Sequence, residues 1–127
     1  MKQSVLLTIA SVFSIFLTTL HLADDIVRGF EKGGPSNLLA VPIAVIWLYG
    51  TLVLAERRSG YVILLLGSLL GSGVPVIHMM GKGVGEIAKS SGGFFFVRTL
   101  LALGVTAIFS LILSAHGLWS LRRGQPR

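Results

Sequence analysis

Residues 99–121 read TLLALGVTAIFSLILSAHGLWSL, a stretch without an acidic residue, lysine or arginine. In hydrocarbon every backbone polar group needs a partner within the protein, so such a stretch must form a helix or a strand of a closed barrel. Barrel strands are only about 9–11 residues long and alternate between apolar and polar side chains. This stretch is longer and almost continuously apolar. It therefore predicts a transmembrane helix.

Three further segments repeat this pattern. The four apolar segments are residues 4–23, 38–55, 61–80 and 94–121. At a rise of about 1.5 Å per residue, each is about long enough to cross a hydrocarbon core about 30 Å thick. Charged residues make up 13% of the chain, against about 25% in soluble domains. We expect an all-α integral membrane protein in which residues 1–127 form a single domain, an antiparallel bundle of four transmembrane helices.

The formal net charge of +6 would suggest nucleic-acid binding in a soluble protein. Here the basic residues flank the apolar segments, where they contact lipid headgroups and stop translocation. We therefore expect the lipid bilayer, and not nucleic acid, as the partner of these charges. The chain has no cysteine, which excludes disulfides, thiolate metal sites and iron–sulfur clusters.

Four spans place both termini on the same side of a multi-pass membrane protein. The basic residues on that side are Lys2, Arg57, Arg58, Arg122, Arg123 and Arg127. The basic residues on the other side are Arg28, Lys32, Lys82, Lys89 and Arg98. Because cytoplasmic loops carry the excess of lysine and arginine, this count of six against five predicts cytoplasmic termini. The connections 24–37 and 81–93 then face outward, and the second of these is rich in glycine.

A polar stripe runs along the first span. Its members are Ser4, Thr8, Ser11, Ser14, Thr18, His21 and Asp25. Spacings of three and four residues keep these side chains on one face of a helix. Small hydroxylated residues let membrane helices approach closely and form hydrogen bonds. The stripe predicts a packing interface through Ser11 and Thr18, and the alternative is a path lined by water or substrate.

The second and third spans carry further packing signals. Gly67 and Gly71 form a GxxxG pattern, which permits close contact between helices, either within the bundle or with a partner. Trp47 and Tyr49 lie well inside the second span, where their polar groups need partners. We expect Tyr49 to face the bundle and Trp47 to face the lipid.

One candidate site emerges from the histidines. His21 and His78 lie near the outward ends of the first and third spans, and Asp25 follows His21 by one helical turn. Ionisable groups at membrane depth are costly and point to function. Three more charged residues are expected in the same outward cluster, namely Asp24, Arg28 and Arg98.

This cluster has four interpretations. His21, Asp25 and His78 could bind a divalent metal ion through imidazole and carboxylate ligands. Alternatively, His21 and His78 could be axial ligands of a haem or chlorin, with Gly67 and Gly71 making room for the ring. The charged groups could instead form a docking surface for another subunit, or only tie the helix ends together.

The sequence favours a role that is not enzymatic. It contains neither an HExxH metalloprotease motif nor a Gly-x-Ser-x-Gly elbow. The hypothesis that follows is a small accessory subunit or homo-oligomeric bundle, which packs through its small residues with itself or with a larger membrane complex. The alternative is a metal- or tetrapyrrole-binding membrane protein that uses His21, Asp25 and His78.

Overall fold

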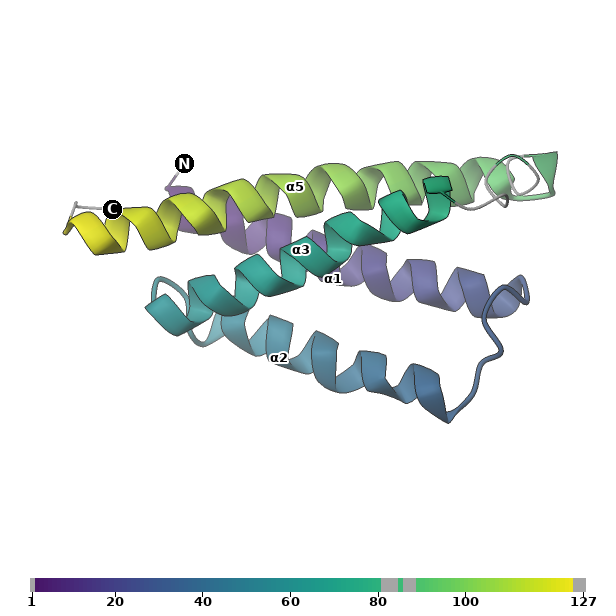
Figure 1. The fold of residues 1–127 in the computed structure, drawn as a ribbon, viewed down its shortest axis with the longest axis horizontal. Coiled ribbons are helices and arrows are strands. Elements are labelled where there is room, and N and C mark those ends of the chain that lie inside the picture. The colour runs from purple at the N-terminus through teal and green to yellow at the C-terminus, as the bar shows by residue number, and fades with distance from the viewer. Residues whose placement is uncertain (1, 81–84, 86–88, 125–127) are drawn as a thin grey trace.

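The computed structural model of the chain describes residues 2–80, 85 and 89–124. Within this part of the chain, four long helices and one short 3-10 helix form an antiparallel bundle (Figure 1). Their bounds are α1 Gln3–Val27, η1 Pro35–Leu39, α2 Ala40–Leu52, α3 Arg58–Met80 and α5 Gly93–Arg123. Most of the predicted glycine-rich connection, at 81–84 and 86–88, and the basic residue Arg127 lie outside the described residues.

The four long helices have the length and composition of membrane spans, once η1 is counted with α2. Large apolar side chains cover their outer surface, as at Phe16 (59% exposed), Ile77 (70%) and Val105 (69%). Such a surface is suited to hydrocarbon and not to water. The predictions of an all-α fold, a multi-pass membrane protein and contact with the bilayer are therefore confirmed. α1 runs four residues beyond the predicted end at residue 23, and α2 ends three residues before residue 55.

α5 packs against both α3 and α1, whereas α2 covers α3 and α1 from the opposite side. Small side chains fill the contacts with α5. Ser68 of α3 donates a hydrogen bond of 2.8 Å to Ser110 of α5, and both residues are fully buried. Close approach through small residues is the usual way for membrane helices to gain packing energy, because burial from lipid supplies no hydrophobic driving force.

The polar stripe of α1 faces its neighbours. Ser11 and Ser14 are both fully buried. The Ser11 hydroxyl lies 2.7 Å from that of Thr51 in α2, and the Ser14 hydroxyl lies 3.2 Å from that of Thr106 in α5. Thr18 is half-buried and donates to the Ser14 carbonyl at 2.7 Å. The stripe thus provides one interhelical hydrogen bond to α2 and another to α5.

The positions of the aromatic residues in α2 are the reverse of those expected. Trp47 is buried, with 3% of its surface exposed, while Tyr49 is 51% exposed. The reason lies in α3, because a Cβ on Gly67 would come within 2.5 Å of the Trp47 ring and one on Gly71 within 3.2 Å. These two glycines leave the space that the indole fills.

Candidate metal centre

Two histidines and one aspartate meet where α1 and α3 end and α5 begins, which we call the site end of the bundle. Asp25 follows His21 by four residues, so one face of α1 carries both side chains. α3 runs in the same direction as α1, and this brings His78, two residues before its last residue, to the same end. The structure thus brings together His21, Asp25 and His78, as the sequence predicted.

The three donor atoms form a compact triangle. His21 Nε2 lies 3.2 Å from His78 Nε2 and 3.3 Å from Asp25 Oδ2. His78 Nε2 lies 3.5 Å from the same carboxylate oxygen. His21 and Asp25 are buried, with 3% and 6% of their surface exposed, while His78 is half-buried. The three atoms, each of which can donate an electron pair to a metal ion, therefore surround one point in a largely buried region.

A backbone carbonyl orients the His78 ring. His78 Nδ1 lies 2.9 Å from the carbonyl oxygen of Val74. A carbonyl oxygen only accepts hydrogen bonds, so Nδ1 carries the proton. In the neutral imidazole Nε2 is then bare, with its lone pair directed at the triangle. A carbonyl that holds the second ring nitrogen is the usual outer partner of a metal-bound histidine.

Two polar atoms of the cluster have no hydrogen-bond partner among the described residues. They are His21 Nδ1 and Asp25 Oδ1, and both are buried. Leaving a buried polar group unpaired costs about 1–3 kcal/mol, more when it is charged. The free carboxylate oxygen shows that the described side chains do not use the full binding capacity of Asp25.

Phe96 is part of this site, although the sequence analysis did not single it out. It is fully buried, and its ring centroid lies 4.9 Å from that of His21 and 5.8 Å from that of His78. The guanidinium of Arg28 lies 5.7 Å from the same ring. Phe96 therefore forms an apolar wall that contacts both imidazoles. The spacing Phe96, Leu100, Leu103, Ala107 along α5 marks a buried face and could have indicated it.

The predicted charged cluster divides into separate contacts. Arg28 donates to Asp24 at 2.8 Å, to Ser90 at 3.3 Å and to the Ser91 carbonyl at 3.2 Å. Arg98 is exposed and stacks over Phe94, with its guanidinium carbon 4.1 Å from the ring centroid. Among the described residues Arg98 forms no ion pair. Asp24 and Arg28 thus neutralise each other, and Arg98 is not part of that pair.

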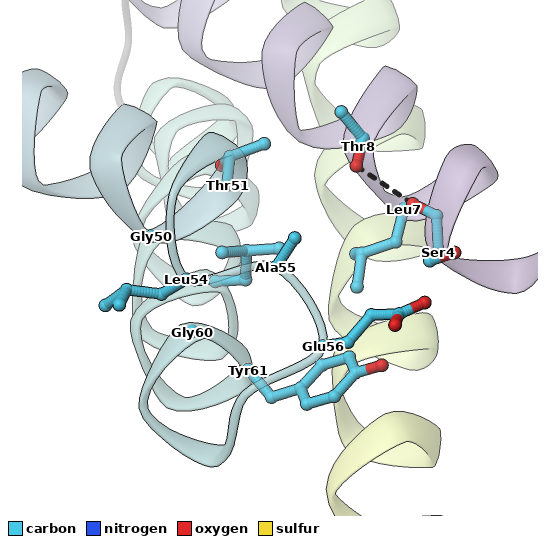
Figure 2. A pocket seen from close by; sticks show the side chains of 11 residues that line it. Ser4, Leu7, Thr8, Gly50, Thr51, Leu54, Ala55, Glu56, Gly60 and Tyr61 are labelled. Atoms are coloured by element: carbon cyan, nitrogen blue, oxygen red, sulfur yellow. Dashed lines mark hydrogen bonds between the residues drawn. The ribbon is translucent and has the colours of Figure 1, made fainter. Parts of the chain in front are cut away.

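The opposite end of the bundle has different polar features. His116 is exposed and lies 2.9 Å from Gln3 Oε1. At the turn between α2 and α3, Ser4, Thr8, Glu56 and Tyr61 line a small cavity (Figure 2). Its volume of about 10 Å³ is room for about one water molecule. This cavity contains no histidine, and among the described residues the group of histidine and aspartate side chains that could hold a metal ion lies at the site end.

Comparison of the chain with known protein families, with curated proteins and with solved structures finds no match to any of them.

Proposed function

We propose that this protein binds a divalent metal ion, zinc by preference, through His21, His78 and Asp25 at the site end of its bundle. The triangle of donor atoms, with sides of 3.2, 3.3 and 3.5 Å, carries this proposal. Ligands about 2.0–2.1 Å from a tetrahedral zinc ion lie about 3.3–3.4 Å from one another. The triangle therefore fits one face of a zinc tetrahedron and leaves the fourth position for water or another ligand.

The type of ligand supports the same ion. Imidazole suits zinc and other late transition metals, whereas magnesium and calcium prefer shells made of oxygen. The buried charge of Asp25 also favours a cation, because a carboxylate removed from water needs a compensating charge. Asp25 makes ion-pair contacts only with the two histidines among the described residues. A bound cation would compensate its charge and use the free Oδ1.

A tetrapyrrole is less well supported. Axial histidines stand on opposite faces of a planar macrocycle, so the ring must pass between their nitrogens. The two Nε2 atoms are 3.2 Å apart and the imidazoles are in edge contact, with centroids separated by 4.6 Å. Gly67 and Gly71, which were expected to make room for such a ring, face the indole of Trp47.

The role of accessory subunit or homo-oligomer also has weaker support. It depends on small-residue faces that are free to meet another helix. Gly67 and Gly71 are covered by Trp47, while Ser11 is fully buried against Thr51 within the same chain. A docking surface of charged groups is likewise less favoured, since Asp24 and Arg28 pair with each other.

Cobalt binding tests the metal proposal, because tetrahedral Co²⁺ replaces zinc and absorbs visible light. Purified, chelator-treated protein in detergent should bind one Co²⁺ per chain with a tetrahedral spectrum, and zinc should displace it. His21→Ala and His78→Ala should lose the spectrum, while the control His116→Ala should keep it. Acidification should release the ion, because protons compete for the imidazoles.

The helical content of each variant, measured by circular dichroism, separates loss of the site from loss of the fold. The proposal fails if the unaltered protein gives no tetrahedral spectrum. It also fails if the folded His21→Ala and His78→Ala variants bind cobalt as well as His116→Ala does.

A further inference from the structure

Arg28 lies just beyond the metal ligands, where α1 ends. It follows His21 by seven residues, so along the axis of α1 it stands about 10 Å farther toward the end of the bundle. Its guanidinium lies 5.7 Å from the ring centroid of Phe96, and that ring contacts both His21 and His78. Phe96 and Arg28 are therefore successive layers over the imidazoles.

The Arg28 side chain joins the end of α1 to the segment that leads into α5. Its Nε donates to Asp24 at 2.8 Å, while its Nη1 donates to the Ser90 hydroxyl at 3.3 Å and to the Ser91 carbonyl at 3.2 Å. The side chains of Arg28 and Asp24 are only 17% and 19% exposed. A planar guanidinium can hold several acceptors at once in fixed directions, which the compact ammonium of lysine does not reproduce.

The backbone at Gly92 is fitted to the same guanidinium. A Cβ on Gly92 would come within 2.7 Å of Arg28 Nη2, and its φ of +76° lies in the left-handed region. Glycine adopts this conformation without the strain that a side chain brings. The residue that precedes α5 thus lies directly against the tip of Arg28.

We propose that Arg28 is a latch on the metal centre, and that a cation enters or leaves from the outward side only while Arg28 is released from its hydrogen-bond partners. The proposal rests on the proposed function, because it concerns access to that same site. The side chains of His21 and Asp25 are only 4% and 8% exposed, and Phe96 is fully buried. A hydrated ion therefore needs a local opening of the structure to reach these ligands.

The partly exposed flank of His78 is a less favourable entrance. Its side chain is 24% exposed, but the neighbouring Ile77 and Met79 are 70% and 71% exposed. Such an apolar surface is suited to hydrocarbon, where charged groups are costly. The aqueous route to the ligands therefore passes the end of α1, where Arg28 lies.

The reactivity of a buried thiol tests the latch without a metal ion. The chain has no cysteine, so His21→Cys places a single thiol in the site. In detergent, a cationic methanethiosulfonate reagent should modify this thiol slowly. Adding Arg28→Lys, which keeps the charge, should raise the rate about tenfold, because charge-assisted hydrogen bonds that hold the latch closed are lost. The matched control Arg98→Lys should leave the rate unchanged, since Arg98 stacks over Phe94 outside the latch.

Asp24→Asn is a second variant, which weakens the latch from its other partner. It also removes a negative charge, and this change alone would slow a cationic reagent. A faster reaction in the His21→Cys background would therefore report the release of Arg28. Equal rates with and without Arg28→Lys and Asp24→Asn would overturn the proposal and place the entrance beside His78.

Cobalt kinetics provide an independent readout in the protein that retains its histidines. Arg28→Lys should raise the rates of cobalt uptake and of release to a chelator by the same factor, because the latch lies outside the ligand set. A lower affinity with unchanged uptake would show that Arg28 supports the ligands and is not a latch. If the unaltered protein binds no cobalt but Arg28→Lys still speeds thiol modification, the proposed function fails and the latch stands. Cobalt binding with unchanged thiol reactivity overturns only the latch.

Discussion

Asp24 and Asp25 are neighbours in the chain but have different electrostatic surroundings. Asp24 is partly exposed and pairs with Arg28 at 2.8 Å, so its charge is balanced by a permanent cation. Asp25 is buried and contacts only imidazoles among the described cationic side chains. Only a protonated histidine or a bound cation could therefore compensate the charge of an ionised Asp25 carboxylate among the described residues. Phe96 lies between this cluster and Arg28, in contact with both imidazoles and the guanidinium.

At this scale we predict that Phe96 positions the metal ligands. Phe96→Leu should lower cobalt affinity by about tenfold, as loss of a supporting residue around a metal site does. The shorter side chain no longer supports both rings, and the tetrahedral absorption bands should shift. Phe95→Leu is the matched control, since Phe95 is 51% exposed. An identical cobalt spectrum and affinity in the two variants would show that Phe96 only fills space.

α2 is the shortest of the four long helices and begins directly after η1. Its contact with α3 depends on how closely the Trp47 ring fits against Gly67. Membrane helices gain stability mainly from such close packing. The GxxxG pattern of α3 therefore packs against the indole of Trp47. The sequence had suggested that it packs against the backbone of another helix.

We predict that Gly67→Ala destabilises the protein by about 1–3 kcal/mol, because the new methyl group overlaps the Trp47 ring. Gly73→Ala on the same helix is the control, since a Cβ there has no neighbour within 4 Å. Thermal unfolding in detergent and the emission wavelength of Trp47 in the Trp119→Phe background measure the effect. Equal stability of the two variants would contradict this account of the α2–α3 contact.

The whole molecule is asymmetric in its polar chemistry. The histidine and aspartate cluster lies at one end, and the beginning of α1, which follows Lys2, lies with the end of α5 at the other (Figure 1). That second end also carries Arg57, in the turn before α3, and Arg58, the first residue of α3. An excess of basic residues at one end favours a cytoplasmic position for it.

We therefore predict that the termini are cytoplasmic and that the metal centre faces outward. The chain has no cysteine, so a single introduced cysteine can show on which side of the membrane its position lies. A membrane-impermeant maleimide should label Lys32→Cys in intact cells, because Lys32 is exposed in the connection between α1 and η1. Lys2→Cys should be labelled only after permeabilisation. The reverse pattern would show that the orientation is inverted.

The sequence by itself determined the helical spans and the pairing of His21 with Asp25. Both follow from local physics, because backbone groups in hydrocarbon must bond within a helix and residues four apart share a face. It also predicted that His78 would join them, since the first and third spans of an antiparallel bundle run in the same direction. These inferences need only helix geometry and the order of the spans.

Only the tertiary structure decided how side chains from different helices fit together. It buried Trp47 and exposed Tyr49, placed Phe96 against the imidazoles and left Arg98 on Phe94. Periodicity along one helix specifies a face but not which neighbour covers it. That choice depends on the rotation and crossing of each helix, which are set by the combined packing of all four spans.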